Sequence, residues 1–149
     1  MMRWLLIDRI LECEPGTSAT GLKNFSRSDD FFQDHFPGMP IVPGVLQVEM
    51  IAQMAGKCIA MSLSNILPVL GSVKSAKFYH NIRPGDQCHI KITVQKIAQS
   101  YSLAEGTIEV AGQKMSSASL LFGHVPRKNV SSEDFDAVTQ EWLKSRQTP

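Results

Sequence analysis

Residues 31–49 read FFQDHFPGMPIVPGVLQVE, a proline-rich segment that leads directly into an apolar one. The prolines at 37, 40 and 43 each fix φ at about −65° and bias the preceding residue toward extended conformations. The segment therefore predicts a stiff loop that holds His35 in a defined position. After Gly44 the apolar residues follow a helical pattern, which predicts one long helix from Val45 to about Leu63.

The predicted helix is apolar on almost every side, and its main interruptions are Gln47, Glu49, Gln53 and Lys57. We expect such a helix to be buried. An ionised carboxylate is costly to desolvate, so Glu49 is expected to favour its protonated form and to be able to donate a proton at neutral pH. Gln53 follows one turn later on the same face and can hold Glu49 in place.

A fixed histidine and a protonated glutamate are the two parts of an acid/base pair. Each also has an ordinary interpretation when it is taken alone. A histidine in a loop is commonly a surface hydrogen-bonding group, and a glutamate in an apolar helix commonly points to water through a gap. The proline and glycine spacing that joins His35 to Glu49 favours the paired interpretation.

Composition limits the class of protein. A chain of 149 residues with 43% hydrophobic and 19% charged residues is expected to form one soluble globular domain. A net charge of +1 gives no electrostatic basis for binding nucleic acid. The polar residues inside 44–63 argue against a membrane span, and the apolar run at the N-terminus is too short for a secretion signal, so a cytoplasmic location is expected.

Cysteine and histidine patterns give no sign of a metal site. Cys13, Cys58 and Cys88 are far apart, and no C-x-x-C motif occurs. The four histidines lack the spacing of metal ligands. We expect buried cysteines, no metal and no cofactor.

The remaining pattern predicts strands around the helix. A hairpin is expected from runs at 4–13 and 18–25 joined by a turn at 14–17, and four later strands are expected at 73–78, 88–94, 101–110 and 114–122. Turn signals occur at 83–86 and 111–113. One helix with about six mostly antiparallel strands predicts an α+β domain whose sheet wraps around the helix.

The last twenty residues predict a short amphipathic helix. Residues 131–134 offer an N-cap, and Phe135, Val138 and Trp142 recur at helical spacing. We prefer packing on the domain's own sheet over a partner-docking or membrane-surface role. The chain is thus divided into a main domain, 1–126, and a C-terminal helical extension, 127–149.

On these residues the sequence resembles the hot-dog-fold 3-hydroxyacyl-[acyl-carrier-protein] dehydratases of the FabZ type. The similarity lies in the motif from Phe32 to Glu49 with its histidine, prolines and glycine, in Ala52-Gln53, in Lys77-Phe78 and in Pro84-Gly85-Asp86. The resemblance implies a hot-dog fold, in which a mostly antiparallel sheet wraps around one long central helix.

The resemblance also implies the reaction, dehydration of a (3R)-hydroxyacyl thioester to the trans-2-enoyl thioester in a tunnel between two protomers. His35 would take the C2 proton, and Glu49 of the partner subunit would protonate the departing C3 hydroxyl. A backbone N–H at Gly44, at the N-terminus of the helix, would stabilise the thioester oxygen. The other members of the expected substrate-binding set are Val45, Gln53, Phe36 and Phe78.

The implied partners are an acyl carrier protein bearing a phosphopantetheine-linked acyl chain and a second copy of the chain. The family forms dimers with sheets joined side by side, often assembled into hexamers as trimers of dimers. Acyl carrier proteins are acidic, so a basic rim is expected to steer them. The candidates, each of which is also an ordinary surface charge, are Lys74, Lys77, Arg83 and Lys91.

Two departures and three alternatives accompany this resemblance. The family commonly has a tyrosine at the tunnel gate and an acidic residue before its Lys/Arg-Phe pair, where this chain has Val69 and Lys74. The same fold also serves acyl thioesterases, non-catalytic acyl-chain binders, and hydratases that act on coenzyme A substrates. Glu49 disfavours the isomerising FabA type, which has an aspartate there.

Overall fold

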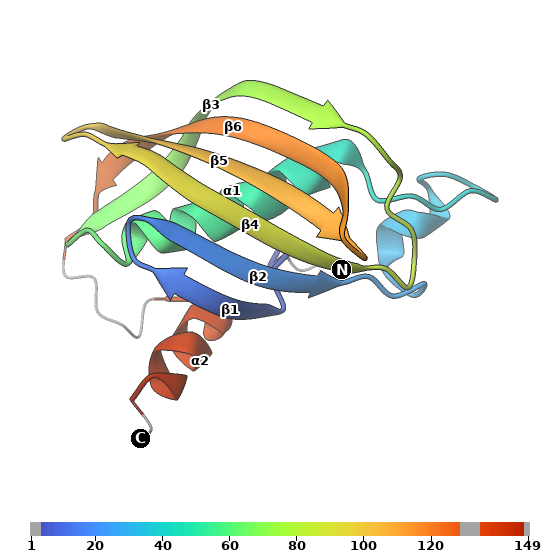
Figure 1. Cartoon of the computed structure of the whole chain (residues 1–149), viewed down its shortest axis with the longest axis horizontal. Coiled ribbons are helices and arrows are strands. Elements are labelled where there is room, and N and C mark those ends of the chain that lie inside the picture. Colours follow the sequence, from blue (N-terminus) through green and yellow to red (C-terminus); the bar gives the residue numbers. More distant parts are fainter. Residues whose placement is uncertain (1–3, 129–134, 148–149) are drawn as a thin grey trace.

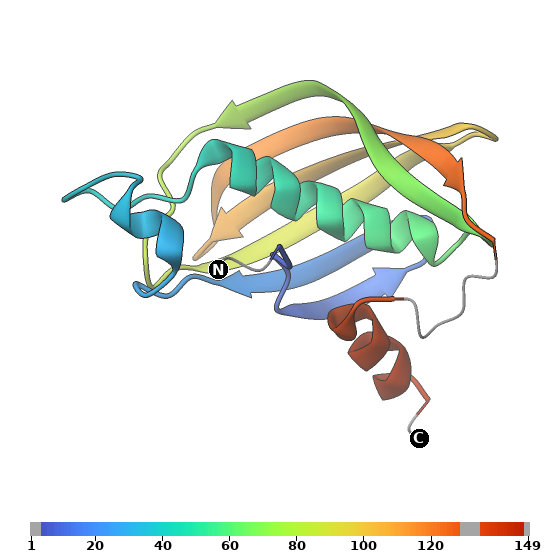
Figure 2. The same cartoon turned by 180° about the vertical axis from the view of Figure 1, so that it is seen from behind.

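A curved six-stranded antiparallel sheet wraps around one long helix in the computed structural model, which describes residues 4–128 and 135–147 (Figure 1). The strands lie in the order β1-β2-β4-β5-β6-β3. Figure 2 shows helix α1 lying across the inner face of the sheet. The expected α+β architecture is confirmed.

Within the described part of the chain, nine elements make up this architecture. In chain order they are β1 (Arg9–Glu14), β2 (Ser18–Asn24), the 3-10 helix η1 (Asp30–Gln33), α1 (Gly44–Ala60), β3 (Ile66–Phe78), β4 (Gln87–Ile97), β5 (Tyr101–Val110), β6 (Gln113–Pro126) and α2 (Ala137–Ser145). Among the helices within the described residues, none is long and apolar enough to cross a membrane.

The first extended run differs from the prediction. The strand begins only at Arg9: Asp8 still donates to Leu22 O of β2, whereas the segment before it contacts α1. The Leu6 N–H donates to Gln53 Oε1 at 2.8 Å, and the side chains of Leu6 and Ile7 are buried. This apolar segment therefore covers the helix, which its composition alone does not distinguish from a strand.

Strands β3 and β6 are longer than the residue pattern predicts. They pair along almost their whole lengths, from Ile66 with Pro126 to Phe78 with Ser116. Pro68 and Gly71 are poor strand formers, but β3 lies at the edge of the sheet, where proline is tolerated. Long-range pairing thus overrides local propensity here.

The core forms between α1 and the inner face of the sheet. The fully buried residues of the helix include Met50 and Met54, which share the core cluster with Ile90 and Ile108. Gly106 of β5 permits this close approach, because a Cβ there would lie 2.4 Å from Ile51 Cγ2. The buried side of the helix therefore matches the prediction.

The opposite side of α1 is not fully buried. The expectation that the helix is buried all round is therefore wrong for a single chain. The Val45 side chain is 77% exposed, and Val48, Glu49 and Gln53 are only half-buried. Beside the helix, edge strand β3 exposes a row of apolar side chains: Leu67, Val69, Leu70 and Val73. One chain has too little sheet to cover both sides of its helix.

Helix α2 packs beside β1, which agrees with the preferred interpretation of its apolar stripe (Figures 1 and 2). Val138 is buried, and Trp142 packs against the core. The expected N-cap at 131–134 lies outside the described residues. The helix is capped by Asp136, whose Oδ1 accepts a hydrogen bond from the Thr139 N–H at 3.1 Å, and Asp136 also pairs with Lys57 of α1.

This ion pair makes the docking of α2 pH-dependent. Burial alone would raise the pKa of Asp136, but the hydrogen bond and charge of Lys57, together with the hydrogen bonds from Thr139, outweigh it and hold that pKa below its ordinary value. Because the folded-state pKa is depressed, the stabilisation is complete above the ordinary aspartate pKa and is lost as the pH falls through the folded-state pKa.

We expect Asp136→Asn, which keeps a capping oxygen but removes the charge, to lower the free energy of unfolding by about 1–2 kcal/mol at neutral pH. Denaturant unfolding of both proteins at pH 7 and in acid measures the difference. The two curves should converge in acid. A difference that is the same at every pH would contradict an ionic contribution.

Candidate active site

The loop before α1 holds His35 through a set of short backbone contacts. The His35 carbonyl accepts from the Ile41 N–H at 2.9 Å, and the next residue, Phe36, exchanges two backbone hydrogen bonds of 2.9 Å with Met39. The Val42 N–H donates to Ile82 O at 2.8 Å, which ties the loop to the body of the domain. These contacts give the loop a defined conformation, and the stiffness expected from its prolines stays a prediction.

The imidazole of His35 is half-buried and has one ring nitrogen engaged. Its Nδ1 lies 3.1 Å from Ile41 O, and the Phe36 ring stacks on it with centroids 3.9 Å apart. A carbonyl only accepts, so Nδ1 carries the proton of the neutral ring and Nε2 keeps a free lone pair. This arrangement suits His35 to act as a base through Nε2.

Glu49 lies on the half-exposed side of α1 and is held by two donors. Its Oε1 accepts from Trp4 Nε1 at 3.1 Å and from Gln53 Nε2 at 3.1 Å. The predicted burial of this carboxylate is wrong for the single chain, because its side of the helix faces away from the sheet. The carboxylate is positioned but not enclosed.

Gln53 connects Glu49 to the N-terminal segment. Its Oε1 accepts from Leu6 N–H, and its Nε2 donates to both Trp4 O and Glu49 Oε1. The prediction that Gln53 holds Glu49 in place is confirmed. These contacts occupy the amide, so the structure gives Gln53 a positioning role, whereas its place in the substrate-binding set stays a prediction.

Two residues of this arrangement escaped the sequence reasoning. Trp4 lies in an apolar run that reads as a strand, and no local signal shows that its indole reaches across to α1. Gln47 is only 3% exposed, and its Nε2 donates to Val42 O at 3.2 Å, so it joins the helix to the His35 loop. The position of Gln47, a polar residue inside an apolar helix, was the sequence signal that could have indicated this structural role.

The N-terminus of α1 brings Gly44 and Phe78 together. A Cβ on Gly44 would lie 3.0–3.3 Å from three atoms of the Phe78 ring, so this ring covers the glycine closely. The first backbone N–H groups of a helix have no partner within it and carry the positive end of its dipole. A carbonyl oxygen placed here would meet unpaired donors.

Three predicted substrate-binding residues are exposed apolar side chains in the region of the N-terminus of α1. They are Phe36, Val45 and Phe78, of which Val45 adjoins Gly44 in α1. One chain thus gathers the loop histidine, the helix N-terminus and apolar side chains at one end of α1. His35 and Glu49 form their hydrogen bonds with different partners, and within the described residues no hydrogen bond joins the two side chains.

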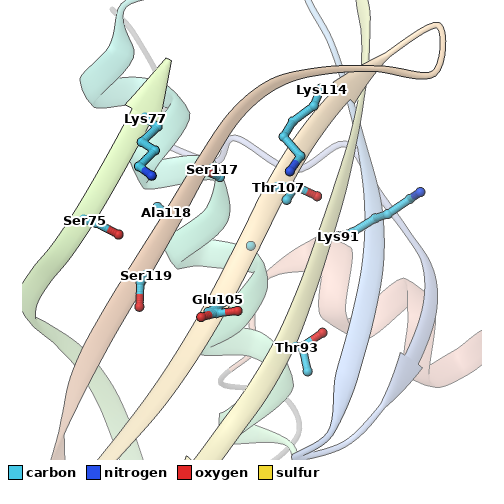
Figure 3. Close-up of a pocket in the computed structure, with 11 residues that line it drawn as sticks. Ser75, Lys77, Lys91, Thr93, Glu105, Thr107, Lys114, Ser117, Ala118 and Ser119 are labelled. Carbon is cyan, nitrogen blue, oxygen red and sulfur yellow. The ribbon is translucent and has the colours of Figure 1, made fainter. Parts of the chain in front are cut away.

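The four basic residues expected to receive a carrier protein come from β3, β4 and the segment between them, and their role stays a prediction. Lys77 and Lys91 line a shallow depression of about 330 Å³ on strands β3 to β6. Figure 3 shows this depression on the outer face of the sheet, with α1 behind it. Lys91 is paired with Glu109 at 2.7 Å, and Lys74 falls at a register irregularity of β3.

Arg83 has a different position. It lines a depression of about 440 Å³ together with Phe78, Tyr79 and His80. Of the four expected docking residues, Arg83 therefore lies beside a residue of the expected substrate site. Within residues 4–128 and 135–147, no group of three histidine, cysteine or acidic side chains is arranged to hold a metal ion.

Comparison with known proteins gives consistent similarities. A family model described as ApeI-like, ApeI dehydratase, matches residues 12–119. The 3-hydroxyacyl-[acyl-carrier-protein] dehydratase FabZ of Clostridium acetobutylicum is 40% identical over 121 residues, which cover 79% of this chain and 85% of that protein. FabZ of Natranaerobius thermophilus is 38% identical over 126 residues, 83% and 88% of the two chains.

Solved structures show the same fold at low identity. The dehydratase heterocomplex ApeI:P from Xenorhabdus doucetiae matches with a TM-score of 0.62 and 21% identity, over 76% of this chain and 96% of that one. The protein smu.793 from Streptococcus mutans, bound to acetyl CoA, matches with a TM-score of 0.68 and 12% identity, over 87% and 96%.

Proposed function

Because this chain belongs to the hot-dog dehydratases of the ApeI-like and FabZ type, we propose that it converts (3R)-hydroxyacyl-carrier-protein thioesters to trans-2-enoyl thioesters with His35 as base and Glu49 as acid. The family supplies the reaction class. The observation that carries the assignment of roles is the His35 ring, whose Nδ1 faces the Ile41 carbonyl and whose Nε2 is left to accept a proton.

Each residue then has a defined part in the reaction. Nε2 of His35 takes the C2 proton, which the neighbouring thioester carbonyl makes acidic, and the electron pair of that bond forms the C2–C3 double bond. The C3–O bond breaks, and the protonated carboxyl of Glu49 gives its proton to the departing hydroxyl, which leaves as water. The negative charge that develops on the thioester oxygen is stabilised by N–H groups at Gly44 and Val45.

We further propose that the site is completed by a second copy of the chain. The exposed apolar row on edge strand β3 and the exposed side of α1 leave a surface that pairing with another β3 would cover. An isologous dimer of this kind brings Glu49 of the partner subunit toward His35. It also covers the side of α1 that carries Glu49.

The direct test of the activity is turnover of a (3R)-hydroxyacyl-carrier-protein substrate by the purified chain. Dehydration yields a conjugated enoyl thioester, detected by its absorbance and by a mass loss of one water. Release of free thiol without an enoyl product would instead assign the protein to the acyl thioesterases. Binding without any conversion, across several chain lengths, would assign it to the acyl-chain binders.

We propose that the acidic carrier protein docks beside Arg83, since this residue shares a depression with Phe78 next to Gly44. Arg83→Glu is expected to raise KM for a carrier-linked substrate about tenfold, through charge repulsion, with little change in kcat. KM for a small pantetheine thioester should stay unchanged. The matched control is Lys91→Glu on the outer sheet face, and an equal rise in KM there would contradict docking at Arg83.

A further inference from the structure

Two thiols that the proposed reaction does not use meet beside the C-terminal helix. Cys13 lies on β1, and Cys58 lies near the C-terminal end of α1. Cys58 Sγ is 3.4 Å from Glu14 O and 3.5 Å from Ser18 O, two residues that pair in the hairpin next to Cys13 and Ala19. Cys58 Sγ therefore lies against the hairpin beside Cys13, and each of the two thiols shifts the pKa of the other.

A surface depression leads to this thiol pair. It has a volume of about 360 Å³ and is lined by Cys13 and its hairpin neighbours together with Trp142 and Arg146. Cys13 is 9% exposed there, whereas Cys58 is completely buried behind it. The Arg146 guanidinium lies 5.6 Å from the Trp142 ring and donates to Cys13 O at 3.5 Å. A small reagent can therefore reach the pair through Cys13.

The environment of the pair also favours the reactive form of a thiol. The contact with Cys13 lowers the pKa of Cys58 to about 7, and the backbone N–H groups of Gly16 and Thr17 contribute, whereas burial opposes them. The same contact and burial raise the pKa of Cys13. Within the pair the thiolate, which is the nucleophilic form, is therefore favoured on Cys58, and the proton is held on Cys13.

We propose that Cys13 and Cys58 are a redox modification site, which forms a reversible intramolecular disulfide when the protein meets a hydroperoxide. Cys13, the thiol that the depression reaches, gives its proton to Cys58 and attacks one peroxide oxygen as its thiolate. The O–O bond breaks, a sulfenic acid forms at Cys13, and the leaving alkoxide, or hydroxide from hydrogen peroxide, takes a proton from water. The second thiol attacks the sulfenic sulfur, and its proton leaves with the displaced hydroxyl as water. The two sulfurs lose two electrons, and the peroxide gains them.

The placement of this disulfide separates it from the proposed catalytic residues. It would join β1 to α1 fourteen residues after Gly44, about 21 Å along the helix. The inference therefore does not depend on the proposed reaction. It also has an internal reference, because Cys88 of β4 is fully buried and burial raises its pKa to about 12.

The test treats the reduced, full-length protein with hydrogen peroxide and follows it by intact mass and by peptide mapping under denaturing, alkylating conditions. We expect loss of two hydrogens per chain, one peptide pair linked through Cys13 and Cys58, one remaining free thiol at Cys88, and recovery of all thiols with dithiothreitol. Cys88→Ser should oxidise as the unaltered chain does. Cys13→Ser and Cys58→Ser should each lose the two-hydrogen change.

Three results would overturn the proposal. They are three intact thiols after treatment that oxidises a control peptide, a linkage that includes Cys88 or joins two chains, and a two-hydrogen loss that persists in Cys13→Ser. Mapping of the unaltered chain decides the question even where a serine variant does not fold, because the linked peptide pair is identified directly.

Discussion

His35→Ala should lower kcat/KM for dehydration by about 10²–10⁴-fold, the usual contribution of a positioned general base. Alanine leaves no group that can accept the C2 proton, while the backbone contacts of the loop to Ile41 and Ile82 do not require the side chain. The measurement is the initial rate of enoyl thioester formation at substrate concentrations well below KM.

The matched control is His89→Ala, a half-buried histidine on β4 outside the expected site. It should retain nearly unaltered kcat/KM, and circular dichroism should show both variants folded. If His35→Ala kept full activity while folded, His35 would not be the base. If His89→Ala were equally inactive, the loss would reflect damage to the sheet instead of loss of the base.

Mixing two inactive variants is expected to restore activity. Glu49→Gln keeps an oxygen that can accept from Trp4 and Gln53 but has no proton of the required acidity, so it too should lose about 10²–10⁴-fold in kcat/KM. In a dimer whose site combines His35 of one chain with Glu49 of the other, a heterodimer of the two variants contains one intact site and one doubly altered site.

Random assembly of equal amounts of the two chains makes half of the dimers mixed, so about one quarter of the unaltered activity should return. Co-expression with two different affinity tags isolates the mixed dimer and allows its rate to be measured. Each variant mixed with itself is the control. A mixed dimer that forms but stays inactive would show that the two residues do not serve a common site across the interface.

Local signals in the sequence predicted several elements closely. Three prolines and Gly44 define a loop followed by a helix; the helix begins at Gly44, one residue before the predicted start, and ends at Ala60, before the predicted Leu63. Strand β5 coincides with the predicted 101–110 because a turn at Ala111–Gly112 ends it and a bend precedes it. These features depend on dihedral preferences of a few neighbouring residues, which the sequence displays directly.

The candidate site was predictable in its residue types but not in its surroundings. The glycine, histidine and glutamate were identified from their spacing and their resemblance to a family. Phe78 covers Gly44 from 34 positions along the chain, which depends on the register of β3. Trp4 reaches Glu49 from 45 positions away, and only the Gln53 contact with Glu49 spans a single helical turn. Sequence patterns carry little information about such distant contacts.

The sequence by itself thus determined the loop that presents His35, the helix that carries Glu49 and the α+β class, because each follows from local backbone preference and hydrophobic periodicity. Only the tertiary structure decided which side of α1 is covered, where α2 packs, and that Cys58 lies against the hairpin that carries Cys13. These outcomes depend on the limited area of one curved sheet and on pairing between distant segments. That area covers one side of the helix and leaves Glu49 on the other.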